Sequence, residues 1–142
     1  MLSNLDWEEF TEDCALHYRL GDLLTLSEKN PISATRLASE YKLINKQISF
    51  NKLTVFSDSP SEVLSRLNHL IDDEVEVLDL PTTQVIASAV CFRYFIGTSS
   101  KVSFWIAAIR SVVHGNRSAL PSENFTQYAS LMGDHINCID GY

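Results

Sequence analysis

The stretch from Ile86 to Arg117 constrains the fold most, because it is dense in aliphatic and aromatic side chains and contains no acidic residue. Arg93, the polar run Gly97–Lys101 and Arg110 interrupt it, so the stretch lacks the roughly 18 consecutive apolar residues that a membrane span needs. We therefore expect a packed core and no membrane anchor.

Helical periodicity predicts two helices within this core. Apolar residues occupy nearly every side of a helix over 82–96, which indicates a central helix surrounded by others. After Gly97, Val102, Trp105, Ile106, Ile109, Val112 and Val113 form the apolar face of a second helix. We expect Phe92 and Trp105 to be buried. The opposite stripe should face solvent or a partner, and it contains Ser103, Ala107, Arg110, His114 and Arg117.

Four further helices are predicted. One runs from about Asp6 to Leu20, where Trp7, Phe10, Cys14, His17 and Tyr18 follow steps of three and four residues. A second, with Ser33 as N-cap, places Leu37, Tyr41, Ile44 and Ile48 on one face. A third begins at Ser59-Pro60 and continues to about Ile71. The last begins near Ser122.

Only two runs are strand-like, Leu53–Phe56 and Val75–Leu80, and they flank the third of these helices. The chain is thus predicted to be mainly α, a single domain over 1–142 with a bundle of about six short helices. A minor two-stranded β element, Leu53–Phe56 with Val75–Leu80, is the one predicted addition.

Composition fits a chain that folds alone: 142 residues, 45% of them hydrophobic and 20% charged. Its three cysteines are too few and too scattered for a disulfide framework, and its start does not resemble a signal peptide. We expect a cytoplasmic protein without a cofactor.

Charge is arranged in blocks that sum to −7: residues 1–28, 57–80 and 121–142 are acidic, whereas 29–56 and 81–120 are basic. Such blocks can neutralise one another or steer a partner. The partner-binding residues predicted from the acidic blocks are Asp6, Glu8, Glu9, Glu12, Asp13, Asp72, Asp73, Glu74 and Glu76. A secondary surface would comprise Arg110, His114 and Arg117.

No catalytic pattern stands out, so the leading hypothesis is a non-catalytic protein-protein interaction module. It would be an inhibitor, immunity-type antagonist, adaptor or assembly subunit that docks on a protein with a basic surface, with DNA mimicry as a variant. Direct binding to nucleic acid is not expected, because a single basic stripe lacks the broad basic footprint that phosphate backbones require.

The alternative is a small enzyme or zinc-binding protein that uses Cys14, His17, His135 and Cys138. Cys138 could also be a nucleophile with His135 as its base. We predict no metal, because the two Cys/His pairs are far apart in the sequence. Gly97–Lys101 could cradle a phosphate ahead of a helix, but it lacks the P-loop pattern and a predicted strand before it, so a helix cap is the simpler interpretation.

Overall fold

The computed structural model describes residues 11–20, 33–98, 100–113, 115–121 and 136–139. In these ranges the chain forms one parallel sheet of six strands and four helices. The prediction of a mainly α bundle is therefore wrong, and the protein is an α/β protein.

Strands and helices alternate along most of the chain. In order they are β1 (Thr11–His17), α1 (Ala34–Gln47), β2 (Lys52–Phe56), α2 (Pro60–Leu67), β3 (Glu74–Leu78), α3 (Thr82–Val90), β4 (Phe92–Ile96), α4 (Lys101–Val113), β5 (Ser118–Pro121) and β6 (Ile136–Ile139).

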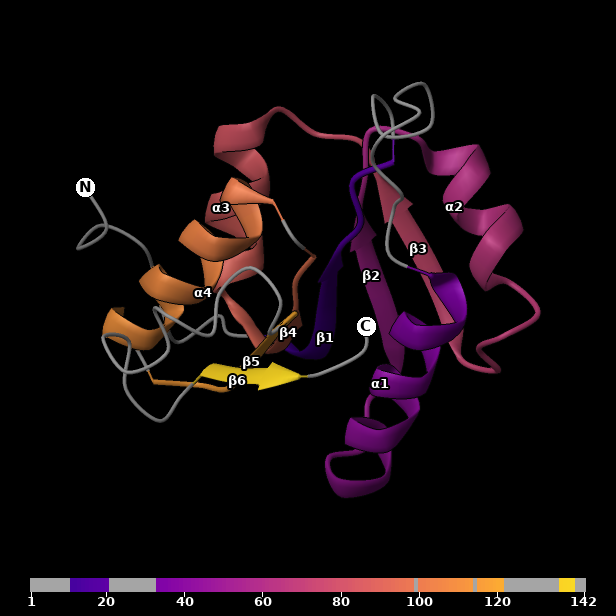
Figure 1. Ribbon diagram of the computed structural model, residues 1–142, viewed down its shortest axis with the longest axis horizontal. Helices are drawn as coiled ribbons and strands as arrows, with labels where there is room; N and C mark the ends of the chain where they lie inside the picture. Colours follow the sequence, from indigo (N-terminus) through magenta and orange to yellow (C-terminus); the bar gives the residue numbers. More distant parts are fainter. Residues whose placement is uncertain (1–10, 21–32, 99, 114, 122–135, 140–142) are drawn as a thin grey trace.

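The strand order is β3-β2-β1-β4-β5-β6, and all neighbouring strands are parallel. From β1 the chain moves outward to β3, then crosses back to β4 on the other side of β1. Figure 1 shows α1 and α2 on one face of the sheet and α3 and α4 on the other. Right-handed crossovers require this change of face when the direction of travel across the sheet reverses.

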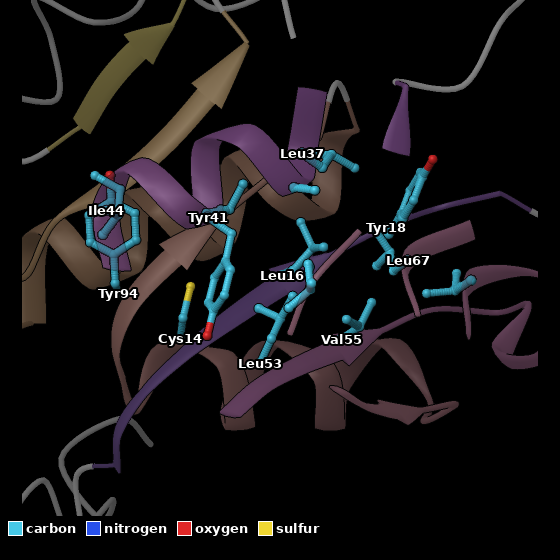
Figure 2. Close-up of a cluster of buried hydrophobic side chains, with 14 of the residues drawn as sticks. Cys14, Leu16, Tyr18, Leu37, Tyr41, Ile44, Leu53, Val55, Leu67 and Tyr94 are labelled. Atoms are coloured by element: carbon cyan, nitrogen blue, oxygen red, sulfur yellow. The ribbon is translucent and has the colours of Figure 1, made fainter. Parts of the chain in front are cut away.

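Each face of the sheet has its own hydrophobic core. Figure 2 shows the core beneath α1 and α2, in which Cys14 and Leu16 of β1 and Leu53 and Val55 of β2 lie near Leu37 and Tyr41 of α1. The core beneath α3 and α4 contains the alternate strand residues, among them Ala15, Phe56 and Phe95. Both faces of the central strands are thus buried.

Two predicted helices are wrong because they fall on such buried strands. The expected helix over Asp6–Leu20 contains β1, and the expected central helix over 82–96 divides into α3 and β4. A strand buried on both faces is a continuous apolar run, which periodicity cannot distinguish from a buried helix. The aromatic and β-branched sequence Phe92–Ile96 was the available signal for a strand.

Other predictions are confirmed. The helix after Ser33 is α1, the helix after Ser59-Pro60 is α2 with Pro60 in its first turn, and the helix after Gly97 is α4. The two strand-like runs are β2 and β3, which pair with each other in parallel. The helix expected from Ser122 lies outside the described residues up to position 135.

The orientation predicted for α4 is wrong, although its position is right. Phe92 is buried as expected, but Trp105 is 57% and Val112 87% exposed. Ser103, Ala107 and Arg110, which were expected on the outer stripe, are completely buried against the sheet. None of the helices in the described ranges has the length and apolarity needed to cross a membrane.

Candidate ligand site at the carboxyl edge of the sheet

A cavity of about 350 Å³ opens where β1, β2 and β3 end. It is lined by the residues that follow these strands and by the first turns of α3 and α4: His17, Arg19, Phe56, Ser57, Asp58, Asp79, Leu80, Thr82, Val85 and Val102. It lies beside the switch point between β1 and β4. In open doubly wound sheets, ligands bind in the crevice outside the carboxyl ends of the strands at such a point.

His17, the last residue of β1, is fixed to the start of α4. Its Nδ1 lies 2.7 Å from Ser103 Oγ and 3.2 Å from Ser100 Oγ. Ser100 immediately precedes α4, and its Oγ accepts a hydrogen bond from the Ser103 amide at 3.1 Å, as an N-cap serine does. Rotation of the imidazole would therefore break its hydrogen bonds to the two serines at the start of α4.

Burial lowers the pKa of His17 to about 4, and the nearby positive charge of Arg19 acts in the same direction. The carboxylate of Asp58 opposes this effect but does not outweigh it. His17 is consequently neutral at physiological pH.

The turn from β4 into α4 brings the helix unusually close to the sheet. A Cβ atom on Gly97 would lie 2.6 Å from Leu120 Cδ2 and 2.8 Å from Ser103 Cβ. Gly97 is thus required because no side chain fits there. Its position after a predicted helix suggested a left-handed conformation, but among the described residues the glycine with positive φ is Gly115.

Thr98 follows Gly97 and lies next to the start of α4. Its amide donates to Ser103 Oγ at 3.0 Å, but its Oγ1 has no hydrogen-bond partner among the described residues, although the residue is 5% exposed. A buried hydroxyl without a partner is uncommon in proteins and often marks a place where a water or ligand binds.

Charged side chains of both signs line the cavity. Arg19 follows β1, Asp58 follows β2 and Asp79 follows β3. Asp58 Oδ1 accepts a hydrogen bond from the Leu20 amide at 3.3 Å, which ties together the loops after β1 and β2. The wall can therefore contact both anionic and hydrogen-bond-donating groups of a ligand.

Of the acidic residues predicted to bind a partner, Asp13, Asp72, Asp73 and Glu74 lie at the opposite, amino edge of the sheet, Glu76 lies in the middle of β3, and several are used within the fold. Asp13 Oδ1 accepts from the amides of Asn51 and Lys52, and Glu76 pairs with Lys52 at 2.6 Å. Asp72 and Glu74 are exposed. Asp6, Glu8 and Glu9, and the side chain of Glu12, lie outside what the structure describes.

A second groove, of about 360 Å³, lies at this amino edge between α1 and the turn before β3. Its central carboxylate, Asp73, already accepts hydrogen bonds through Oδ2 from the Tyr41 hydroxyl at 2.8 Å and from Asn45 Nδ2 at 2.9 Å. The groove is thus held together by its own polar groups.

The secondary partner surface is not formed as predicted. The Arg110 guanidinium is buried and donates to Ser118 Oγ and to the carbonyl oxygens of Ala89, Val90, Phe92, Arg93 and Arg117. Arg117 is exposed, and His114 lies outside the described residues.

The Cys/His set does not meet as a zinc or catalytic site would require. Cys14 and His17 point to opposite faces of β1, because Cys14 belongs to the core under α1 whereas His17 contacts α4. Cys138 is in β6, which β4 and β5 separate from β1, and His135 lies outside the described residues. Within the ranges described, no three His, Cys, Asp or Glu side chains gather as metal ligands.

Sequence reasoning missed Arg19, Asp58 and Asp79 as site residues. Each lies one or two residues after the end of a strand, and polar residues at such positions would have been the signal once the sheet was identified. Compared with protein-family models and with curated protein sequences, the chain matches none.

Proposed function

We propose that the protein binds a nucleotide, or a small molecule that contains one, in the cavity at the carboxyl edge. The observation that carries the proposal is the position of this cavity, beside the switch point of a β3-β2-β1-β4-β5-β6 sheet. Fold alone does not establish function, so the side chains in the cavity must match the ligand.

The charged groups of the cavity suit the parts of a nucleotide. The Arg19 guanidinium can hold a phosphate, for which its planar set of donors is well shaped. The carboxylates of Asp58 and Asp79 can accept hydrogen bonds from ribose hydroxyls or from a base, and an acidic residue near the end of the second strand is the usual ribose ligand in sheets of this order. The volume falls within the usual range of small-molecule sites.

Gly97–Lys101 supports the same proposal. One argument against a phosphate cradle here is that no strand is predicted before this segment, and β4 is such a strand. The Thr98 hydroxyl, which has no partner among the residues described, lies beside the positive end of the α4 dipole. The connection from β1 to α1 contains a single glycine, Gly21, so the glycine-rich dinucleotide fingerprint is missing. Binding of a phosphate group would therefore depend on Arg19 and on the start of α4.

Calorimetric titration with ADP, GDP, CDP and UDP, and with pyrophosphate alone, tests the proposal. We expect saturable binding of at least one nucleoside diphosphate, tighter than pyrophosphate, and a loss of at least about tenfold in affinity in Arg19→Ala. Lys42→Ala, at the amino-edge groove, is the matched control and should bind as the wild type does. No binding by any of the four nucleotides would refute the proposal.

A protein-protein interaction module remains a second candidate, supported by the exposed apolar residues of α4, Trp105 and Val112. The acidic surfaces support it less, because Asp13, Asp73 and Glu76 have partners within the fold. A protein captured by the wild type but not by Trp105→Ala would favour this function, and equal capture by both would argue against it. That the chain is not an enzyme stays a prediction.

A further inference from the structure

The environment of His17 determines which of its two ring nitrogens carries the proton. Both hydrogen bonds of the ring within the described part of the chain are on Nδ1, with Ser103 Oγ at 2.7 Å and Ser100 Oγ at 3.2 Å. The ring also lines the carboxyl-edge cavity. One side of the imidazole is thus committed to α4, and Nε2 is the nitrogen left for other contacts.

Each serine hydroxyl already acts as an acceptor. Ser103 Oγ accepts from the Thr98 amide at 3.0 Å, and Ser100 Oγ accepts from the Ser103 amide at 3.1 Å. Each hydroxyl also has one hydrogen to donate, and both residues are buried. Among the described residues, the acceptor that these contacts place within reach of both hydroxyls is an unprotonated His17 Nδ1.

A proton on Nδ1 would break this arrangement, because two buried hydroxyl hydrogens would then lose their acceptor. A buried donor without a partner is unfavourable. The contacts therefore favour the Nε2–H tautomer over the Nδ1–H tautomer and the imidazolium, and the lowered pKa of His17 agrees with a neutral ring.

We propose that Ser100 and Ser103 hold His17 as its Nε2–H tautomer, and that His17 donates this N–H to an acceptor oxygen of the ligand in the cavity. The ligand half of this inference rests on the proposed nucleotide-binding function. The acceptor would be a phosphate, carbonyl or hydroxyl oxygen. Ser100 and Ser103 are positioning residues, which act on the ligand through His17.

The arrangement differs from a serine nucleophile activated by histidine. In such a pair the serine must reach the substrate, whereas Ser103 is completely buried and lies between the ring and the backbone of Thr98. His17 in the Nε2–H form has no free lone pair to act as a base in the cavity. Its role is recognition of an acceptor.

Long-range ¹H–¹⁵N correlation spectra of the histidine rings in the free protein test the tautomer directly. The His17 signals are assigned by their loss in His17→Gln. We expect an unprotonated Nδ1 and a protonated Nε2 at neutral pH, and a shift toward a tautomer mixture in Ser103→Ala. Ser39→Ala is the matched control, since the Ser39 hydroxyl is exposed and bonds only to its own helix at Thr35. A protonated Nδ1 in the wild type would overturn the proposal.

Titration of the labelled protein with ADP, GDP, CDP and UDP tests the ligand half separately. We expect the Nε2 resonance to move on saturation, His17→Gln to keep most of the affinity because its amide N–H can replace the donor, and His17→Leu to lose about tenfold. Nucleotide binding with an unmoved Nε2 would refute the donor role while leaving the proposed function intact. The predicted tautomer without any nucleotide binding would overturn the ligand half together with that function.

Discussion

The two edges of the sheet use their polar residues differently. At the amino edge, Asp13, Asp73 and Arg110 are bonded to backbone amides, to neighbouring side chains or to carbonyl oxygens. At the carboxyl edge, Arg19 and Asp79 line a cavity, and the Thr98 hydroxyl has no partner in the described part of the chain.

The difference indicates which edge serves stability and which serves a ligand. A polar group that is bonded within the fold contributes to holding it together, whereas charged side chains on the wall of a cavity favour recognition of a ligand. Substitutions at the amino edge should therefore lower the free energy of unfolding, and those in the cavity wall should mainly lower affinity.

The largest expected effect is that of Arg110→Met. It removes the guanidinium that donates to five carbonyl oxygens and to Ser118 Oγ near the amino ends of β4 and β5. We expect a loss of about 3–5 kcal/mol in urea unfolding. Arg110→Lys should recover only part of it, because an ammonium cannot span so many acceptors. An unchanged unfolding midpoint would mean that the amino edge does not depend on this residue.

His17 should make stability depend on pH. In the unfolded chain His17 binds a proton below about pH 6.5, whereas in the folded chain it binds one only below about pH 4. The stability that the neutral His17 ring contributes is therefore fully present above about pH 6.5 and is lost as the pH falls toward 4. This loss lowers the free energy of unfolding by about 3 kcal/mol. Unfolding of wild type and His17→Gln between pH 7.5 and 4.5 measures it, and parallel curves would contradict the expected neutral, buried ring.

Gly97→Ala should cost about 1–3 kcal/mol, because the new methyl group would collide with Leu120 and Ser103. Relief of the collision requires α4 to move away from the sheet, which would also separate Ser103 from His17. We expect thermal unfolding at lower temperature together with weaker nucleotide binding. A variant as stable as the wild type would show that there is room for a methyl group between α4 and the sheet.

The smallest effects come from a matched pair at the two ends of β3. Asp73→Ala removes the acceptor of Tyr41 and Asn45, so it should destabilise by about 1–2 kcal/mol without changing nucleotide affinity. Asp79→Ala, at the cavity, should stay within about 0.5 kcal/mol of the wild type while weakening nucleotide binding. If Asp73→Ala weakened nucleotide binding and Asp79→Ala lowered stability instead, the roles assigned to the two edges would be wrong.

Much of the secondary structure could be predicted from the sequence, but the sheet could not. Amphipathic faces and start signals at Ser33 and Ser59-Pro60 located α1 and α2. β1 and β4 were taken for helices, because strands buried on both faces carry no alternation of polar and apolar residues. Without these two strands the order of the sheet, and hence the fold class, was out of reach.

The orientation of α4 shows why hydrophobicity alone misplaced the site. The helix turns Ser103 and Ala107 toward the sheet, since only small residues fit where Gly97 allows close approach, and Arg110 is buried by its hydrogen bonds. Trp105, the more apolar residue, is left outside. The sequence predicts His17 as a position on a helix face or as a candidate metal ligand, whereas its contacts with Ser100 and Ser103 depend on residues more than eighty positions away.

Amide chemical-shift mapping with the tightest-binding of ADP, GDP, CDP and UDP tests the central claim most directly. The account predicts that the largest shifts lie at the carboxyl edge, at His17 to Arg19, Ser57 to Asp58, Asp79 to Thr82 and Thr98 to Val102, with Tyr41, Asn45 and Asp73 unchanged. Shifts concentrated at the amino-edge groove, or none at saturating nucleotide, would contradict it.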